Sequence, residues 1–190
     1  MCGVLKQTEG EVFIKGVSMR ENPVEAKRYI GFLPQKPPLY NDLTVEEFLA
    51  FTANIRRIPT GEVAEAIKVV MGRCGLSHFR KRLVRNLSGG YQQRLGIAQA
   101  IIHNPELVIF DEPTNGLDPA GMKQIRDLLK MLCTEYGITI VVSSHILSEI
   151  ESIADTVGVI NHGVLMKEVT MKEISEMSLA YIELNVINTK

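Results

Sequence analysis

The chain has 190 residues, of which 45% are hydrophobic and 23% charged, and its formal net charge is −1. This length suits one domain with a full core and an inserted subdomain, and the charge excludes the basic excess typical of nucleic-acid-binding proteins. No apolar run reaches the roughly 18 residues that a membrane span needs, and no signal-peptide pattern follows Met1.

Short β-rich runs then alternate with longer segments of helical periodicity, which favours an α/β protein with a largely parallel sheet. Residues 11–16 predict a strand and a turn. A short helix follows, opened by a capping box of Asn22, Pro23 and Glu25. Residues 29–35 predict the next strand.

Residues 43–85 predict a helical insert between strands. Thr44 and Glu47 form a capping box ahead of its first helix. A second helix has an apolar face from Val63 to Met71 and ends at Gly75.

Two short apolar runs, residues 107–110 and 138–142, predict buried strands. The helix between them begins at Asp118, which precedes a proline, and ends at Gly137. Cys2, Cys74 and Cys133 are odd in number and lack CxxC spacing, which favours reduced structural thiols.

The last part of the chain predicts a helix around residues 146–153, a hairpin that turns at residues 161–163, and a short helix capped by Thr170 and Glu173. We therefore expect one partial domain in three parts. These are a core of residues 1–42 and 86–170, the helical insert of about residues 43–85, and a C-terminal extension of residues 171–190.

Polar side chains follow the predicted strands. Asp111 and Glu112 end one of them, at the edge where open α/β folds bind ligands. One carboxylate there can hold Mg²⁺ while its neighbour takes a proton from an attacking water. His145 and Gln35 end two further strands. An imidazole can donate to a phosphate, and an amide can bind a metal or orient water. Taken alone, each also fits an ordinary loop residue.

The stretch LSGGYQQRLGIAQAI opens a predicted helix with Ser88, Gly89 and Gly90. Two glycines there cost about 1 kcal/mol each relative to alanine. Bare N–H groups at the positive end of a helix, beside a serine at the N-cap, form a seat for an anion. The alternative is a plain capping turn, for which one glycine usually suffices.

The string LSGGYQQRLGIAQAIIHNPELVIFDEPTNGLDP, followed by SSH, resembles the signature motif, Walker B strand, D-loop and switch histidine of an ABC-transporter ATPase subunit. The string IGFLPQKPPLYNDLTVEEFL is similar to the Q-loop and the start of the helical subdomain. The resemblance covers nearly the whole chain and implies a P-loop NTPase core, with a mostly parallel sheet and a helical insert. NGLDP and the C-terminal ISEMSLAYIELNV resemble bacitracin, lantibiotic or drug exporters, and Tyr91 replaces a common glutamine.

In this family two ATPase subunits hold two ATP molecules head to tail. The resemblance therefore implies ATP and Mg²⁺ as ligands and a second ATPase subunit as partner. It implies that Ser88, Gly89 and Gly90 grip the γ-phosphate held by the partner, that Gln92 also binds nucleotide, and that Asp118 bridges the dimer.

For the other half of the site, the resemblance implies that Asp111 supports Mg²⁺ and that Glu112 is the general base. It also implies that His145 contacts the γ-phosphate, while Gln35 binds the metal and senses that phosphate. The groove of the helical insert would take a coupling helix from a transmembrane permease. The chain would then be a cytoplasmic ATPase at the inner face of the membrane, driving solute export without nucleic acid.

The family motif GxxxxGK[ST] is absent, since none of the 15 glycines is followed by lysine. The first residues, MCGVLKQTEGEVFIKG, resemble the segment just after that motif, so we expect a chain truncated at its N-terminus, without the P-loop and its strand. The loss of three charge-assisted hydrogen bonds removes ~5 to 9 kcal/mol of the binding free energy for ATP. This is most of the binding free energy of a ligand with a micromolar dissociation constant. We therefore expect neither tight ATP binding nor turnover by this chain alone, and an exposed edge at residues 138–142.

Three hypotheses follow from these patterns. The first is the ATPase subunit of an ABC exporter. The second is a catalytically silent ABC-domain fragment that acts as an interaction module through its insert and dimer face. The third is a soluble cassette ATPase of translation or DNA repair, which the absence of a second cassette and of long coiled coils disfavours.

Overall fold

The computed structural model describes residues 3, 5 and 7–178. The chain forms two units, one ending at His145 and the other beginning at Ile146. In the described residues, no helix is both long and apolar enough to cross a membrane.

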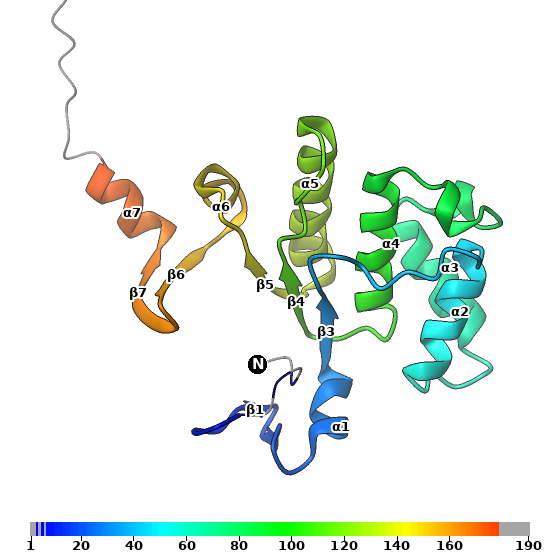
Figure 1. The fold of residues 1–190 in the computed structure, drawn as a ribbon, viewed down its shortest axis with the longest axis horizontal. Helices are drawn as coiled ribbons and strands as arrows, with labels where there is room; N and C mark the ends of the chain where they lie inside the picture. The colour runs from blue at the N-terminus through cyan, green and yellow to red at the C-terminus, as the bar shows by residue number, and fades with distance from the viewer. Residues whose placement is uncertain (1–2, 4, 6, 179–190) are drawn as a thin grey trace, which may run out of the picture. The chain divides into compact units, whose positions relative to one another are not determined.

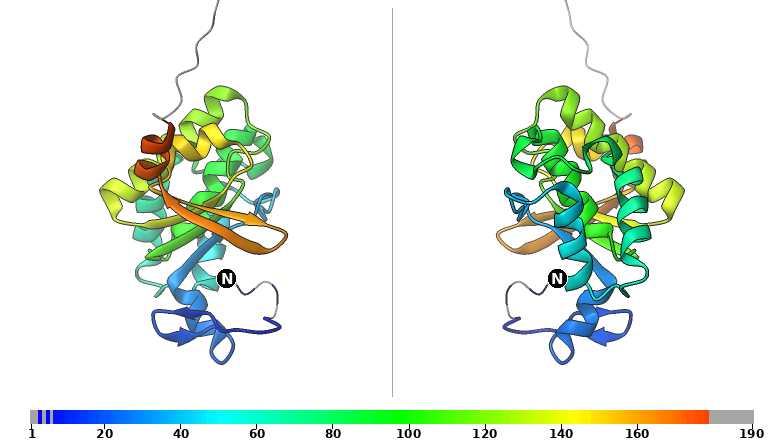
Figure 2. Two further views of the ribbon diagram at one scale, coloured as in Figure 1. Left: turned by 90° about the vertical axis from the view of Figure 1, so that its left-hand side faces the viewer. Right: turned by 90° about the vertical axis from the view of Figure 1, so that its right-hand side faces the viewer.

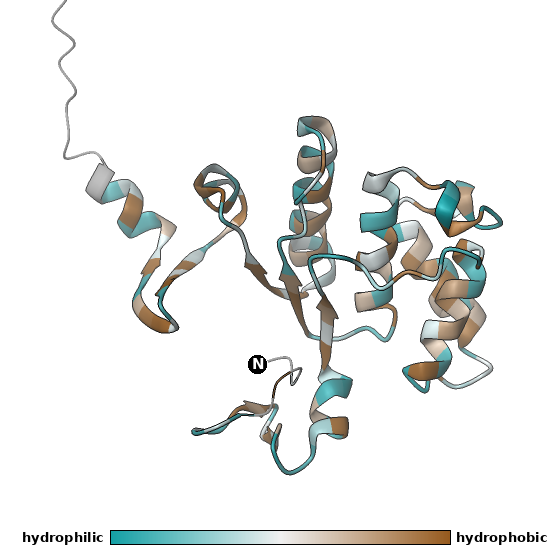
Figure 3. Cartoon of the chain, in the orientation of Figure 1, coloured by the Kyte–Doolittle hydropathy of each residue, from teal (hydrophilic) through white to brown (hydrophobic). Residues whose placement is uncertain are grey.

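A three-stranded parallel sheet lies at the centre of the first unit (Figure 1). Its middle strand, β4 (Leu107–Asp111), pairs with β3 (Ile30–Leu33) on one side and β5 (Thr139–Ser143) on the other. The register places Asp111 opposite Ser143. All three strands consist mainly of apolar residues (Figure 3). This sheet confirms the expected α/β class.

Two helices pack on the sheet: α4 (Gly89–Ile101) against β3 and α5 (Pro119–Tyr136) against β5. Figure 2 shows them from two sides. The contact of α4 with β3 is a backbone contact, because a Cβ added at Gly31 would lie 2.3 Å from the carbonyl oxygen of Ala100. The absent side chain at Gly31 therefore sets how closely α4 approaches the sheet.

The expectation that residues 138–142 form a second buried strand is wrong, because the side chains of β5 are not buried. Its side chains alternate between exposed and half-buried, and Val141 is 43% exposed. In the part of the chain that the structure describes, β4 is its only pairing strand. The expectation of an exposed edge at residues 138–142 therefore agrees with the structure.

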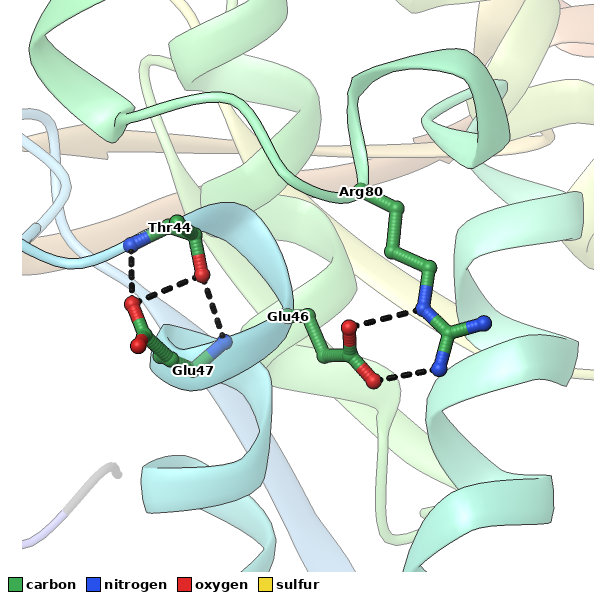
Figure 4. A network of polar contacts seen from close by, with 4 residues as sticks. All are labelled: Thr44, Glu46, Glu47 and Arg80. Atoms are coloured by element: carbon green, nitrogen blue, oxygen red, sulfur yellow. Dashed lines mark hydrogen bonds and ion pairs between the residues drawn. The ribbon is translucent and has the colours of Figure 1, made fainter.

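The helical insert contains α2 (Val45–Ile55) and α3 (Val63–Arg73), which pack on each other. The predicted capping box begins α2: Thr44 N donates to Glu47 Oε2 at 2.8 Å, and Glu47 N donates to Thr44 Oγ1 at 3.3 Å (Figure 4). The bond from the Thr44 backbone lowers the pKa of Glu47. Gly75 follows α3 with φ +66°, as predicted for the residue that ends this helix.

An ion pair joins the start of α2 to the segment after α3. Arg80 Nε donates to Glu46 Oε2 at 2.7 Å, and a second bond from Arg80 completes a bidentate pair (Figure 4). The bond lowers the pKa of Glu46 and raises that of Arg80. Backbone bonds from Val45 N to Arg82 O and from Glu46 N to Arg80 O, both 3.0 Å, run alongside. These contacts fix the helical insert at this end.

The capping box predicted for Asn22 and Glu25 is wrong. Asn22 precedes α1 (Pro23–Ala26), but its side chain makes no cap bond. The carboxylate of Glu25 instead accepts from Arg28 Nη1 at 3.1 Å and from Tyr29 Oη at 3.2 Å. The proline stands at the first helical position, as predicted.

The remaining elements of the first unit are short: strands β1 (Phe13–Ile14) and β2 (Val17–Ser18), which pair antiparallel, and the 3₁₀ helices η1 (Lys27–Tyr29), η2 (Ser77–Phe79) and η3 (Val84–Asn86).

The second unit consists of α6 (Leu147–Ile153), β6 (Thr156–Asn161), β7 (Val164–Thr170) and α7 (Met171–Ser178). β6 and β7 form the predicted hairpin, and the turn residues His162 and Gly163 both have positive φ, as a tight hairpin turn requires. Thr170 N donates to Glu173 Oε2 at 2.8 Å, which confirms the capping box of α7 and lowers the pKa of Glu173. Residues 179–190 of the predicted extension lie outside the described residues.

Candidate functional site

Four residues lie at the carboxyl edge of the sheet: Asp111 and Ser143 end β4 and β5, and Glu112 and His145 follow these strands. Ser143 Oγ donates to Asp111 Oδ1 at 2.7 Å and accepts from Glu112 N at 3.0 Å. His145 Nδ1 lies 2.8 Å from Glu112 Oε2 and 2.9 Å from Oε1. The structure therefore brings together Asp111, Glu112 and His145, three of the residues singled out from the sequence. We call these three and Ser143 the edge cluster.

The backbone of Glu112 has an uncommon conformation. Glu112 has φ +48°, a left-handed conformation that costs a non-glycine residue about 1 kcal/mol or more. Besides the bond from Glu112 N to Ser143 Oγ, two backbone bonds hold it there: Glu112 N donates to Ser143 O at 3.2 Å, and Asn115 N donates to Glu112 O at 3.0 Å. Its side chain is 19% exposed, whereas that of His145 is 67% exposed. Strained backbone of this kind clusters at active sites.

Ser143 is a member of the edge cluster that the sequence reasoning missed. Its signal is positional, because it stands opposite Asp111 in the parallel register and two residues before His145. That register becomes visible only once the pairing of β4 with β5 is known. Ser143 links the carboxylate of Asp111 to the backbone of Glu112.

Gln35 follows β3 by two residues and is exposed. Within the described residues, no hydrogen bond joins it to Asp111 or Glu112. The described residues also contain no group of three or more His, Cys, Asp or Glu side chains placed to hold a metal ion. Mg²⁺ in nucleotide sites commonly takes only one or two carboxylates, together with phosphates and water, and Asp111 fits that role.

The predicted anion seat lies at the start of α4. Ser88 is its N-cap residue, as predicted, but the Ser88 side chain makes no cap bond. A Cβ at Gly90 would meet nothing within 4 Å, and one at Gly89 only Leu117 Cδ2 at 3.9 Å. Neither glycine has positive φ. Internal packing and backbone conformation therefore do not require glycine at either position, which leaves space for a group from outside the chain.

The seat opens on a cavity of about 350 Å³. Its lining includes Ser88, Gly89, Gly90 and Asp118, and none of the edge cluster. Asp118 also caps α5, since its Oδ1 accepts from Gly121 N at 3.0 Å. The structure thus divides the candidate residues between the edge cluster and this cavity.

Gln92 does not line this cavity, and its amide nitrogen already has a partner, because Nε2 donates to Val84 O at 3.3 Å. Tyr91 lines the cavity, and its ring packs on that of Phe79 with centroids 4.3 Å apart. Arg94, also in the lining, donates to Cys74 O at 3.0 Å. The seat therefore has an aromatic ring and a cation beside it.

Cys74 is fully buried, and burial raises its pKa to about 12. A thiol with such a pKa is not a nucleophile near neutral pH. This supports the interpretation of Cys74 as a structural residue.

A larger groove of about 940 Å³ lies on the helical insert, between α1, α2, α3 and the end of α4. Val24, Ile55 and Val69 present exposed apolar surface to it. Its lining also contains His103. Nε2 of His103 lies 3.2 Å from Ile30 O, and burial lowers the pKa of this histidine to about 4. We call this the insert groove.

A family model described as ABC transporter matches residues 1–115, which include both glycines of the seat and the acid pair. The chain belongs to the ABC transporter family. This ABC chain is 43% identical over 183 residues to the bacitracin transport ATP-binding protein BcrA of Bacillus licheniformis, covering 96% of this chain and 59% of that protein.

The lantibiotic transport ATP-binding protein SrtF of Streptococcus pyogenes is 38% identical to the ABC chain over 170 residues, with 88% of this chain and 70% of SrtF covered. These relatives confirm both the resemblance to ABC nucleotide-binding subunits and the bacitracin and lantibiotic subtype. The chain spans 59% of the length of BcrA and of the Bacillus subtilis ABC transporter ATP-binding protein YcbN, to which it is 41% identical over 97% of its residues.

Two solved structures show the same fold. CbiO1 of Clostridium perfringens, described as part of the ABC transporter complex cbiONQ, has a TM-score of 0.83 at 27% identity, with 94% of this chain and 73% of that chain covered. The ATP-binding cassette MJ0796, in a dimeric post-hydrolysis state bound to ADP and Pi, has a TM-score of 0.77 at 27% identity, with 90% and 77% covered. The predicted architecture of an ABC ATPase is thereby confirmed.

Proposed function

We propose that this chain belongs to the ATP-hydrolysing subunit of an ABC exporter, in which hydrolysis drives the export of a solute across the membrane. The observation that carries the proposal is the Glu112 carboxylate held 2.8 Å from His145 at the carboxyl edge of a parallel sheet. Ligands of open α/β folds bind at that edge. There the Glu112 carboxylate can accept a proton from a water that attacks a phosphate, and the His145 ring can donate a hydrogen bond to that phosphate.

The edge cluster would act on the nucleotide as follows. Asp111, oriented by Ser143 Oγ at 2.7 Å, would hold Mg²⁺ through water. Glu112 would accept the proton of the water that attacks the γ-phosphate, and His145 would donate to that phosphate. Gln35, on the loop after β3, would bind the metal, sense the γ-phosphate and pass that signal to the helical insert.

The seat would act on a nucleotide held by a second subunit. Support comes from the cavity, whose lining includes Ser88, Gly89 and Gly90 but no member of the edge cluster. Bare amides at a helix start favour an anion, and an anion from outside accounts for two glycines that no contact among the described residues requires. Gln92 and Asp118 would lie beside that nucleotide in a head-to-tail dimer.

A transmembrane permease would be the second partner, docked in the insert groove, with the subunit on the cytoplasmic face of the membrane. The relatives support this partner through their names as transport ATP-binding proteins and through CbiO1 as part of a transporter complex. The exposed apolar side chains in the groove suit the apolar face of a short helix.

The sequence contains no GxxxxGK[ST] motif, the element that cradles the β- and γ-phosphates. We therefore propose that these 190 residues by themselves neither bind ATP tightly nor hydrolyse it. The same observation favours a second candidate function, a catalytically silent ABC domain that acts through its insert and dimer face.

The test compares the purified chain with a chimera in which a β-strand and a GxxxxGK[ST] phosphate loop are fused before Met1. Calorimetry with MgATP should find no binding tighter than about 1 mM for the chain, whereas the chimera should bind and hydrolyse MgATP. Hydrolysis by the chain alone would refute the proposed dependence on the motif. A folded chimera that binds ATP without hydrolysing it would favour the silent domain.

A further inference from the structure

The insert groove combines apolar walls with an excess of positive charge. Its apolar side chains come from three elements, with Val24 of α1 69% exposed, Ile55 of α2 63% and Val69 of α3 39%. Its charged lining consists of five cations and two carboxylates, a difference of three, in a chain whose formal net charge is −1. The charged residues are Lys27, Arg28, Arg56, Arg57, Arg73, Glu62 and Glu65.

Ion pairs inside the chain do not neutralise this excess. Arg28 pairs with Glu25 at 3.1 Å and Glu65 pairs with Lys68 at 3.5 Å, so that each already has a partner outside the lining. Arg73 donates to the Asn104 amide oxygen at 3.3 Å and stacks on an aromatic ring. Among the residues that the structure describes, no carboxylate pairs with Arg73 or with the two arginines at the end of α2.

Arg56 is the cation for which a counter-charge matters most. It is half-buried, and Nη1 donates to two backbone carbonyls, Lys27 O at 3.1 Å and Ile30 O at 3.3 Å. Burial lowers its pKa. A partly desolvated guanidinium bound only to neutral groups gains more from a carboxylate than an exposed one does. Arg57 lies beside it, exposed, and adds a second charge at the same end of the groove.

We propose that the insert groove binds a short amphipathic helix whose apolar face covers Val24, Ile55 and Val69 and whose polar face carries carboxylates that pair with Arg56 and Arg57. The inference rests on the proposed function, since it takes this helix to come from the membrane subunit. It specifies the chemistry of that partner: an acidic helix, rather than a neutral or basic one.

A displayed library of four-turn helices tests this chemistry on the purified full chain. The helices share a fixed apolar stripe, and their polar positions are drawn from Glu, Gln and Lys. We expect binders to be enriched in Glu over Lys by about tenfold or more, an enrichment that shrinks as salt rises because partly exposed ion pairs are screened. Arg57→Glu should shift the preference toward Lys, whereas Lys123→Glu on α5, an equal charge change at an exposed position outside the groove, should not.

Arg57→Gln keeps the test valid if the charge reversal destabilises the chain, because it should lower the Glu enrichment without adding a negative charge. Binders that favour Gln or Lys, or whose Glu preference survives both Arg57 variants, would overturn the inference. The proposed function would stand in that case, since ATP hydrolysis by the chimera is measured separately. Failure of the chimera would instead refute the proposed function and leave the helix preference measurable.

Discussion

Gly31→Ala should destabilise the chain more than the size of one methyl group suggests. The added Cβ would lie 2.3 Å from Ala100 O and 3.0 Å from Val108 Cγ1. Carbon and oxygen atoms normally approach to about 3.3 Å, so α4 and β3 must separate by roughly 1 Å. Overpacking of this kind costs about 1 to 3 kcal/mol. The expected loss lies near the upper end, because the clashing atom is backbone and cannot rotate away.

Gly72→Ala on α3 is the matched control. A Cβ at Gly72 meets nothing within 4 Å, so the same substitution should stabilise the chain by about 0.5 to 1 kcal/mol through the higher helix propensity of alanine. Urea unfolding followed by circular dichroism measures both changes. With a slope of about 2 kcal/mol per molar urea, a loss of about 3 kcal/mol for Gly31→Ala should lower the midpoint by about 1.5 M. Midpoints that move together, or a Gly31→Ala variant as stable as its parent, would refute the proposed contact.

Three further predictions concern single side chains. Ser143→Ala should cost about 1 kcal/mol in urea unfolding by leaving Asp111 Oδ1 without its 2.7 Å donor. His103→Gln should make stability less sensitive to acid. The pKa of His103 is about 4 in the folded chain against the ordinary 6.5, so the unfolded chain takes up the proton first as pH falls. The free energy of unfolding of the parent should therefore drop by ~2 kcal/mol between pH 7 and pH 5. Thr44→Ala should cost about 1 kcal/mol at pH 7. Its effect should shrink as pH falls through the lowered pKa of Glu47, where protonation weakens the capping box in the parent.

A different result would contradict each of these three predictions. An unchanged midpoint for Ser143→Ala would mean that the bond to Asp111 contributes nothing net. Equal acid sensitivity of the parent and His103→Gln between pH 7 and pH 5 would place the responsible titration elsewhere. A pH-independent cost of Thr44→Ala would show that Glu47 does not act through the cap.

Local patterns predicted helix starts only where no competing partner was available. Thr44 and Glu47 meet as the spacing predicts, because no other side chain in the described part of the chain binds the Glu47 carboxylate. The Asn22 box has equally suitable residues, yet Glu25 binds Arg28 and Tyr29 one turn further on. One-dimensional spacing cannot rank two partners that lie within reach of the same carboxylate.

In the candidate site, too, the local sequence predicts some features, whereas others depend on which strands pair. The positions of Asp111, Glu112 and His145 after apolar strands predicted that they would lie at one sheet edge, because parallel strands share their carboxyl ends. The role of Ser143 depends on which residue it faces across β4 and β5, and the sequence does not contain that register. The exposed side chains of β5, such as Val141, depend likewise on which strands are its neighbours.

The measurement that tests the central claim most directly is MgATP hydrolysis by the chimera with Glu112 replaced by glutamine. If Glu112 is the general base, Glu112→Gln should lower the rate by about 10² to 10⁴-fold while MgATP still binds, as calorimetry would show. Hydrolysis within about threefold of the unsubstituted chimera, at unchanged ATP affinity, would contradict the role assigned to Glu112 and with it the catalytic assignment of the edge cluster.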